Sequence, residues 1–300
     1  MAISRAQLVK ELEPGLNALF GLEYKQYSQE WTEVFDTESS DRAFEEEVML
    51  SGFANAAVKP EGQGVTFDDA QETFTARYTN ETIALAFAIT EEAIEDNLYD
   101  RLASRYTKAL ARSMANTKQV KAAAVLNNGF NANFAGGDGV ALFATDHPTI
   151  AGTFSNELAV ASDLNETSLE QALIDIAAMT DERGLKIASR GMKLIIPSAL
   201  QFTADRLMKS EGRTGTADND INAVRNMGMI PEGYTVNHFL TSNKKWFIKT
   251  DVPNGLKHFV RSPIKTSMEG DFDTGNVRYK ARERYVFGFS DPRGIFGSDI

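Results

Sequence analysis

Hydrophobic residues recur at every fourth position between Glu91 and Leu126, which predicts one uninterrupted helix over that range. The repeating positions are Ile94, Leu98, Leu102, Tyr106, Leu110 and Met114. Thr90 suits the N-cap, and Asn127 to Gly129 form a good C-terminal stop. A helix of about 36 residues is roughly 54 Å long, about three times the mean globular helix. We therefore expect neighbouring copies of the chain to supply part of its contacts.

Apolar and polar residues alternate before this helix as they do in half-buried strands. Phe44 to Phe53 and Val65 to Tyr78 flank a turn-rich link at 58–64, so they predict a long β-hairpin whose first strand is acidic. A two-stranded ribbon is only marginally stable alone in water, so we expect another subunit to cover it. The alternation from Ile83 to Ile89 predicts a further strand that leads straight into the helix.

The first 40 residues combine a short amphipathic pattern with an aromatic segment. Leucines at positions 8, 12, 16 and 19 predict a helix, and Pro14 and Gly15 lead us to expect it to end near residue 13. The aromatic segment, which could be an extended arm, contains Tyr24, Tyr27, Trp31 and Phe35. These apolar side chains could pack on the core of their own chain or on a neighbour.

The second half of the chain follows an α/β rhythm after a stretch rich in glycine and asparagine at 130–158. Helices are predicted at 168–182, 198–209 and 221–227, and strands at 192–196, 234–240 and 245–250. Two last strands are predicted at 256–267 and 276–289. The pattern indicates a compact second domain followed by strands that close the fold.

Composition excludes several classes of protein. The 300 residues are 42% hydrophobic and contain no cysteine, so a core can form without disulfides, and thiolate metal sites and cysteine nucleophiles are excluded. A reducing cytosolic origin fits this composition. No stretch reaches the roughly 18 apolar residues of a membrane span, and the N-terminus lacks the apolar run of an export signal. We expect no contact with a membrane.

The net charge of −11 is unevenly distributed along the chain. Of the 31 basic and 42 acidic residues, 6 and 21 lie in the first 100, which leaves 25 and 21 for the remainder, so the two parts carry −15 and +4. The acidic part could serve solubility alone, or it could lie against a basic surface of a neighbouring subunit. The overall acidity argues against a dedicated nucleic-acid reader.

Candidate catalytic residues are few. Asp146 and His147 are adjacent, but no G-x-S-x-G motif supplies a nucleophile, and a turn in which Pro148 restrains the histidine is the simpler interpretation. A hydrolase that uses this pair remains a minor alternative. We expect no enzyme activity, no catalytic residues and no cofactor.

Candidate ligand sites are also weak. Two pairs of aspartates, Asp218 with Asp220 and Asp271 with Asp273, resemble part of a calcium loop but lack its closing glutamate, so we interpret both as turns and expect no metal site. The glycines at 136, 137 and 139 match no phosphate-binding motif, and mobility is the simpler interpretation. Four basic residues alternate from Arg278 to Arg284, so they share one face of a strand. This strip could contact phosphate or the acidic part of the chain, and we favour the second.

Several segments resemble the major capsid proteins of tailed bacteriophages, the family with the Hong Kong ninety-seven fold, and are most similar to the Mu-type major head subunit. They are ITEEAIEDNLYDRLASRYTKALARSMANTKQ, LFATDHP, GTADNDINAVRNMG and FIKTDVPNGLKHFVRSPIKTSMEGDFDTGNVRYKARERYVFGFSDPRG. Together they extend over most of residues 78–297, whereas the first 40 residues add little to the resemblance.

The resemblance implies an α+β fold with five parts. These are an N-terminal arm at 1–43, an extended loop hairpin at 44–78, a peripheral domain at 79–164 with a spine helix at 91–126, an axial domain at 165–253 and return strands of the peripheral domain at 254–300. It also implies that hexamers and pentamers of this subunit form an icosahedral shell around double-stranded DNA, in a virion assembled in the host cytoplasm.

The same resemblance implies particular partners. A separate scaffold protein, or a very short removed segment, is expected because the chain begins almost directly with its arm, and portal and decoration proteins are further expected partners. DNA would be contacted non-specifically at most. An encapsulin, a bacterial compartment that has the same fold but holds enzymes, is the alternative, which the Mu-type segments disfavour.

Overall fold

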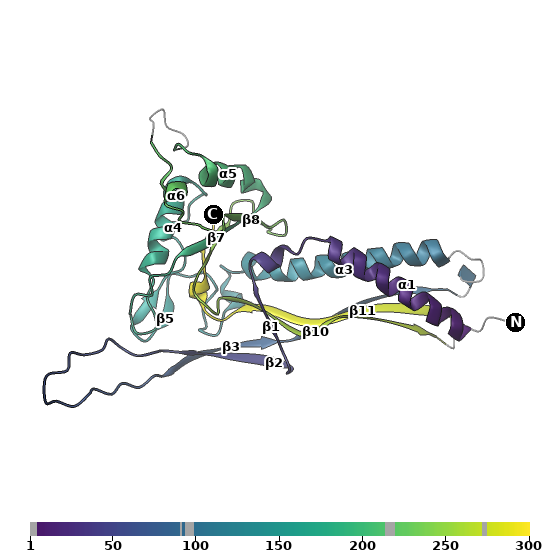
Figure 1. Ribbon diagram of the computed structural model, residues 1–300, viewed down its shortest axis with the longest axis horizontal. Helices are drawn as coiled ribbons and strands as arrows, with labels where there is room; N and C mark the ends of the chain where they lie inside the picture. Colours follow the sequence, from purple (N-terminus) through teal and green to yellow (C-terminus); the bar gives the residue numbers. More distant parts are fainter. Residues whose placement is uncertain (1–4, 91, 94–98, 214–219, 272–274) are drawn as a thin grey trace.

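The computed structural model describes residues 5–90, 92–93, 99–213, 220–271 and 275–300. It shows an elongated layer of helices on a long sheet, a second layered part that contains the C-terminus, and a hairpin that projects away from the long sheet (Figure 1). This α+β arrangement confirms the predicted fold class.

The long sheet has the strand order β1-β10-β11-β4. Its strands are β1 (Asp36–Ser39), β4 (Glu81–Ile89), β10 (Leu256–Gly270) and β11 (Val277–Phe289). β1 runs parallel to β10, and the other neighbours are antiparallel. Helices α1 (Arg5–Gln26) and α3 (Tyr99–Asn127) cover one face, where the buried cluster includes Leu16, Phe20, Leu110, Met114 and Tyr279 (Figure 1).

The predicted long helix is present as α3, which ends at Asn127 as its C-terminal signal indicates. Residues 92–93 are helical, but residues 91 and 94–98 lie outside the described part, so the predicted start at Glu91 is not tested. Tyr106 and Leu110 show why the strict four-residue spacing is imperfect: Tyr106 is 48% exposed and Leu110 is buried, because a spacing of four drifts around a helix of 3.6 residues per turn.

The expected end of the first helix near residue 13 is wrong. α1 continues through Pro14 to Gln26, and its second half buries Leu16 and Phe20 in the core formed with α3 and the sheet. This burial outweighs the hydrogen bond that proline cannot make. The aromatic segment also packs on its own chain, because Trp31 in the 3-10 helix η1 (Glu30–Glu33) and Phe35 belong to a buried cluster with Leu126.

The predicted hairpin forms, with shorter strands than expected. β2 (Phe44–Leu50) pairs antiparallel with β3 (Glu72–Thr79), with a register shift between Val48 and Leu50. Residues 51–71 contain no strand, and Gly52 adopts a positive φ of 64° where the paired region ends.

The second part is built on a sheet of order β12-β9-β7-β8. It comprises β7 (Gly191–Ile196), β8 (Tyr234–Val236), β9 (Trp246–Thr250) and β12 (Ile295–Ser298), with helices α4 (Glu166–Ala178), α5 (Gln201–Lys209) and α6 (Ala223–Asn226). The side chain of Asn165 accepts a hydrogen bond from the Ser168 backbone and thereby begins α4. β12 was not expected, and it returns the end of the chain to this sheet beside β9.

Short elements complete the structure. β5 (His147–Thr149) pairs with β6 (Gly152–Phe154), and the 3-10 helices η2 (Ala132–Phe134), η3 (Ser198–Leu200) and η4 (Pro292–Gly294) lie in connections. The stretch at 130–158 is therefore mostly irregular, as its composition indicates.

Candidate assembly surfaces

The distal part of the hairpin exposes large apolar side chains. Val58 and Phe67 are 94% and 93% exposed, and Phe53 and Val65 are 60% and 68% exposed. Monomeric soluble proteins rarely expose apolar groups in such concentration, and exposed apolar groups that gather in one place mark interaction sites. Residues 51–71 are thus a candidate interaction surface.

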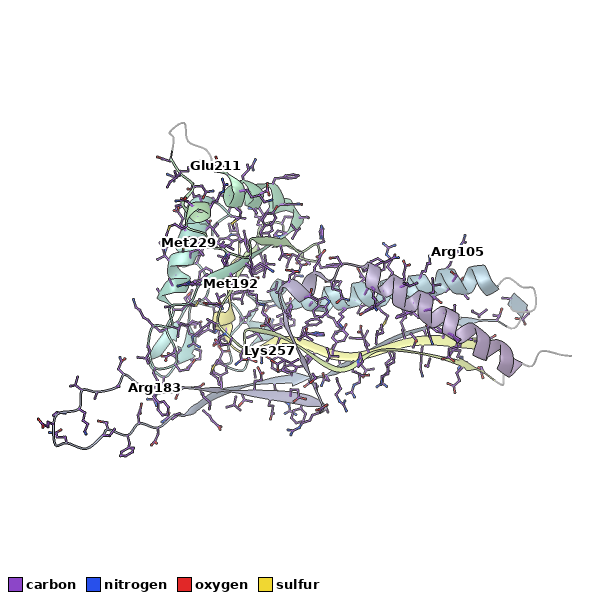
Figure 2. All side chains as sticks on the ribbon, in the orientation of Figure 1. Arg105, Arg183, Met192, Glu211, Met229 and Lys257 are labelled. Atoms are coloured by element: carbon purple, nitrogen blue, oxygen red, sulfur yellow. The ribbon has the colours of Figure 1, made fainter. Side chains whose placement is uncertain are left out.

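The root of the hairpin is fixed by buried charges. The Lys257 side chain on β10, which is 4% exposed, contacts the carboxylate of Glu47 on β2, and its Nζ lies 2.8 Å from Glu38 Oε1 on β1 (Figure 2). Glu47 also accepts a hydrogen bond from Ser290, whose hydroxyl contacts that of Tyr78 on β3. These contacts hold both strands of the hairpin against the long sheet.

A second tether holds the hairpin farther out. Arg183, in the turn after α4, donates from Nη2 to the backbone oxygen of Asp69 at 2.7 Å (Figure 2). The carboxylate of Asp68 accepts a 2.8 Å hydrogen bond from the Ala54 backbone across the hairpin, which lowers the pKa of Asp68, and the charge of Arg183 adds to that effect. The two limbs therefore keep a defined spacing beyond the paired strands.

The three acids of β2 have different roles. Glu45 accepts hydrogen bonds from Ser40 and from the backbone of Asp41 and Arg42, which lower its pKa, and Glu47 binds Lys257. Only Glu46 is free of such internal bonding, with Arg77 Nε at 3.8 Å and both side chains well exposed. Neutralising all three would therefore disturb the subunit itself, so this triple change does not isolate an effect on assembly.

Four acids near the N-terminus have basic partners within the chain. Carboxylates that precede the hairpin pair with bases of the C-terminal half: Glu30 with His238, Glu33 with Lys193, Asp36 with Lys249, and Glu38 with Lys257. The nearest N–O distances are 2.6, 2.5, 3.0 and 2.8 Å. These contacts join residues 30–38 to both sheets, and the three that involve lysine leave less of the excess acidity for a neighbour.

The basic strip of β11 lies on the sheet face opposite α1 and α3, because the alternate residues Tyr279 and Ala281 are buried beneath those helices. The strip consists of Arg278, Lys280, Arg282 and Arg284, and Lys265 of β10 pairs in register with Arg282. We call these five residues the basic face. Arg278 contacts Asp271. Within the described residues, no acid forms an ion pair with Lys265, Lys280 or Arg282. The residues of β4 that lie beside the strip are the small ones, Thr82, Ala84, Ala86 and Ala88.

The glycines at 136 and 137 serve close packing rather than mobility. A Cβ on Gly137 would lie 2.6 Å from the backbone oxygen of Thr75 on β3, and one on Gly136 would lie 2.5 Å from the ring of Phe289. Gly139 adopts a φ of 81°. The loop thus fits between the hairpin and the long sheet.

His147 is a structural residue, and its partner is not Asp146. The ring is fully buried, with Nδ1 2.6 Å from Asp138 Oδ2, Nε2 3.1 Å from Asn156 Oδ1, and its face stacked on Phe154. Asn156 also donates to the backbone oxygens of Leu142 and Pro292. Asp146 is exposed, so the proposed catalytic pair is not brought together.

The other histidines do not form a catalytic arrangement. His258 is fully buried between aromatic rings, and burial, assisted by the charge of Lys118, lowers its pKa from 6.5 to about 3. His238 binds Glu30 near the surface. The three rings belong to separate environments.

The aspartate pairs do not form a metal site in the described chain. Asp218 and Asp273 lie outside it, so the two calcium-like loops are not tested as wholes. The backbone oxygen of Asp271 accepts a hydrogen bond from Gly275, as in a turn. No group of three potential ligands occurs among the residues that are described.

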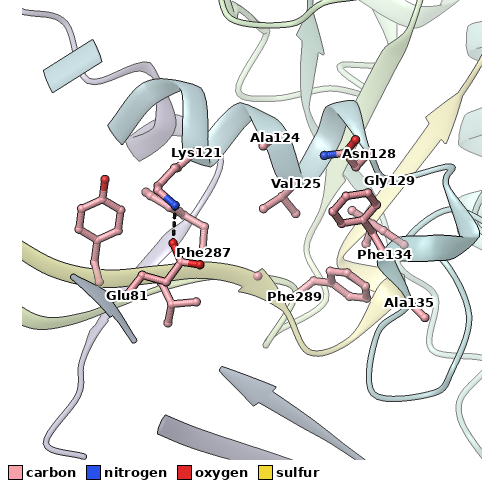
Figure 3. Close-up of a pocket in the computed structure, with 14 residues that line it drawn as sticks. Glu81, Lys121, Ala124, Val125, Asn128, Gly129, Phe134, Ala135, Phe287 and Phe289 are labelled. Atoms are coloured by element: carbon pink, nitrogen blue, oxygen red, sulfur yellow. Dashed lines mark hydrogen bonds and ion pairs between the residues drawn. The ribbon is translucent and has the colours of Figure 1, made fainter. Parts of the chain in front are cut away.

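A pocket of about 430 Å³ lies between the end of α3 and β11 (Figure 3). Val125, Phe134 and Phe289 form apolar walls, and Lys121 is ion-paired with Glu81 at its edge (Figure 3). The described residues that line it include no histidine, serine or threonine. Its surface suits apolar contact better than catalysis.

None of the described helices is both long and apolar enough to cross a membrane.

Three solved structures are similar over most of the chain. The virus-like particle from Pyrococcus furiosus is 11% identical, with 95% of this chain and 98% of that chain covered and a TM-score of 0.54. The procapsid of bacteriophage JBD30 is 17% identical, with 99% and 76% covered and a TM-score of 0.56. The capsid of an empty GTA particle is 14% identical, with 89% and 88% covered and a TM-score of 0.54. These similarities establish the fold.

A comparison with curated proteins finds no match to this chain. The family described as phage capsid protein matches residues 72–297, from the second strand of the hairpin into β12. The architecture agrees with the Hong Kong ninety-seven fold expected from the sequence. The chain therefore belongs to the phage capsid protein family.

Proposed function

We propose that this chain is the major capsid protein of a tailed phage and that its copies assemble as hexamers and pentamers into an icosahedral head around double-stranded DNA. The observation that carries the proposal is the projecting hairpin, whose apolar distal part is left exposed by the described remainder of its own chain. Membership of the capsid family supports a structural role without catalysis.

Charge complementarity supports a specific contact between neighbours. Between residues 44 and 72 the chain has one base, Lys59, and seven acids: Glu45, Glu46, Glu47, Glu61, Asp68, Asp69 and Glu72. The basic face carries cations that no described acid neutralises. We propose that the hairpin of one subunit lies over the basic face of the next, where opposite potentials set orientation and register.

A charge exchange tests this contact. Glu61→Lys with Glu72→Lys reverses two exposed hairpin acids, and Lys280→Glu with Arg282→Glu reverses two exposed cations of the basic face. Each double variant is expected to lower particle yield about tenfold, because like charges then oppose each other across the contact. Particle yield is measured by sedimentation and electron microscopy.

Combination of the two double variants is expected to restore particles, since the charges are again opposite. Lys186→Glu, an exposed charge reversal in the second part of the molecule, is the control for a reversal away from the contact. Unchanged yield in both double variants, or no recovery on combination, would reject the electrostatic contact. The circular dichroism spectra should match that of the wild type throughout.

The finer expectations belong to the same proposal. They are a Mu-type relationship, the five-part division given above, residence in the virion after assembly in the host cytoplasm, and separate scaffold, portal and decoration partners. DNA contact would be non-specific. An encapsulin-type shell is the weaker alternative, and the similarity to the Pyrococcus furiosus particle, at 11% identity, is one of fold alone. Protein cargo inside purified shells, instead of DNA in infected cells, would support that alternative.

A further inference from the structure

β4 is an edge strand of the long sheet with one side unpaired. Its nine residues pair with β11 in an unbroken register from Glu81 opposite Tyr285 to Ile89 opposite Val277. No described strand pairs with its other side. An unpaired edge of this length presents a row of backbone donors and acceptors to any extended segment.

This edge lacks the features by which proteins protect such strands. Residues 82–90 contain no charge and no proline, and the β4–β11 register shows no bulge. The opposite edge of the same sheet is different, because β1 has only four residues and includes Asp36 and Glu38. Leu85 at the middle of β4 is 46% exposed, and Tyr106 of α3 beside Phe87 is 48% exposed. The β4 edge is thus long, regular, uncharged from Thr82 onward and partly apolar.

We propose that β4 pairs antiparallel with β4 of a second copy across a two-fold axis at Leu85, which joins the two long sheets into one. This pairing rests on the proposed shell function, since it defines one contact between subunits. A two-fold contact must be self-complementary. Centring it on Leu85 overlaps all nine residues of both strands and places Leu85 opposite itself.

The resulting neighbours are compatible. Ile83 lies opposite Phe87 on the helix-covered face, and Ala84 lies opposite Ala86 on the other face. Glu81 lies opposite Ile89, so the two glutamates do not meet, and each is already ion-paired with Lys121. Pairs of β-branched, aromatic and aliphatic residues directly opposite each other stabilise sheets, whereas like charges destabilise them.

The cations of the two basic faces do not oppose this pairing. β11 is one strand away from β4, so the two β11 strands would be three strand spacings apart, or about 14 Å. That distance exceeds the Debye length of about 8 Å at physiological ionic strength, so repulsion between the strips is screened.

A second copy fits this edge better than the other extended segments of the chain. β2 carries three glutamates, β3 includes Arg77, and β1, β8 and β12 have four residues or fewer. Among the described strands, β4 alone combines nine residues with a charge-free run. Its own counterpart is therefore the occupant that matches it in length and charge.

Cysteine scanning tests the pairing without interference from other thiols, because the chain contains no cysteine. Directly opposite residues of antiparallel strands have Cα atoms about 4.5 or 5.5 Å apart, within the range of a disulfide. Leu85→Cys is therefore expected to give covalent dimers when assembled particles are oxidised. Ala84→Cys is the register control, since its own copy would be about 8 Å away. Dimer yield on non-reducing gels should differ about tenfold between them.

The outcomes separate this inference from the proposed function. Normal particles of Leu85→Cys without dimers would overturn the pairing and leave the shell function intact, whereas failure of the wild type to form any particle would count against the shell function. If Leu85→Cys does not assemble, the double variant Ala84→Cys with Ala86→Cys replaces it, because those positions face each other across the axis. Dimers from that variant support the pairing, and their absence from its particles overturns it.

Discussion

At the residue scale, Glu283 shows both the contact that a buried charge adds to the long sheet and the hydration that its burial removes. Its side chain on β11 is 1% exposed, and Lys118 Nζ of α3 lies 3.4 Å away. Burial raises the pKa of Glu283, although the charge of Lys118 lowers it in part, and burial likewise lowers the pKa of Lys118. The ion pair thus joins α3 to the sheet without recovering all of the lost hydration.

This pKa shift predicts the pH dependence of stability. The folded state holds the Glu283 proton more tightly than the unfolded chain does, so its contribution is most favourable below pH 4.5 and is lost as pH rises through the raised pKa. Glu283→Gln cannot ionise. Its free energy of unfolding should therefore improve relative to the wild type as pH rises from about 4 to 7 in urea titrations of unassembled subunit. A difference that is constant, or that moves the other way, would contradict this assignment.

His147 marks the limit of residue-level prediction. The absence of a nucleophile motif argues against a catalytic base at this position, but the expected turn is the strand β5, and neither the burial of the ring nor its partners Asp138 and Asn156 follow from adjacency in sequence. Asn156 contacts Leu142 and Pro292, so its role depends on the tertiary approach of distant segments. Local patterns contain no signal for such a cluster.

At the scale of elements, periodicity predicts structure wherever one face is continuously buried. α3 and β4 were predicted from apolar spacing, whereas β10 and β11 were predicted from their content of strand-forming residues. The prediction fails at α1, where packing of Leu16 and Phe20 overrides Pro14, and at β12, whose four residues are too few for a periodic signal. It also overextends the hairpin strands, because alternation continues through residues that no partner strand meets.

The hairpin tip gives a prediction at this scale. Deletion of Lys59 to Gly64 removes exposed residues whose one described hydrogen bond joins Gln63 to Pro60. The free energy of unfolding of the subunit should change by less than about 0.5 kcal/mol, because no buried contact is lost. Particle stability or geometry should nevertheless change, since the tip lies where a neighbour is expected.

Thermal melting of the subunit and electron microscopy of particles measure the two effects separately. Gly64→Ala, which keeps the length of the tip and has open space around it, is the matched control. Particles of the deletion variant with wild-type yield and heat resistance would show that the tip makes no contact of consequence.

At the scale of the whole molecule, the charge pattern has two parts. Residues 30–38 use their acids to bind His238, Lys193, Lys249 and Lys257 within the chain, whereas the distal hairpin and the basic face retain unmatched charges of opposite sign. The sequence alone showed the charge asymmetry. It could not show which charges are paired within the chain and which remain unpaired, because ion pairs depend on which segments the fold brings together. The unmatched part is the one available for contact between subunits.

Electron microscopy of the purified chain, with its mass distribution measured over a range of concentrations, tests the central claim most directly. The account predicts capsomers or closed icosahedral particles whose fraction increases with concentration, because the exposed hairpin is covered only by other copies. A stable monodisperse monomer at high concentration, under conditions in which its scaffold is also supplied, would contradict it.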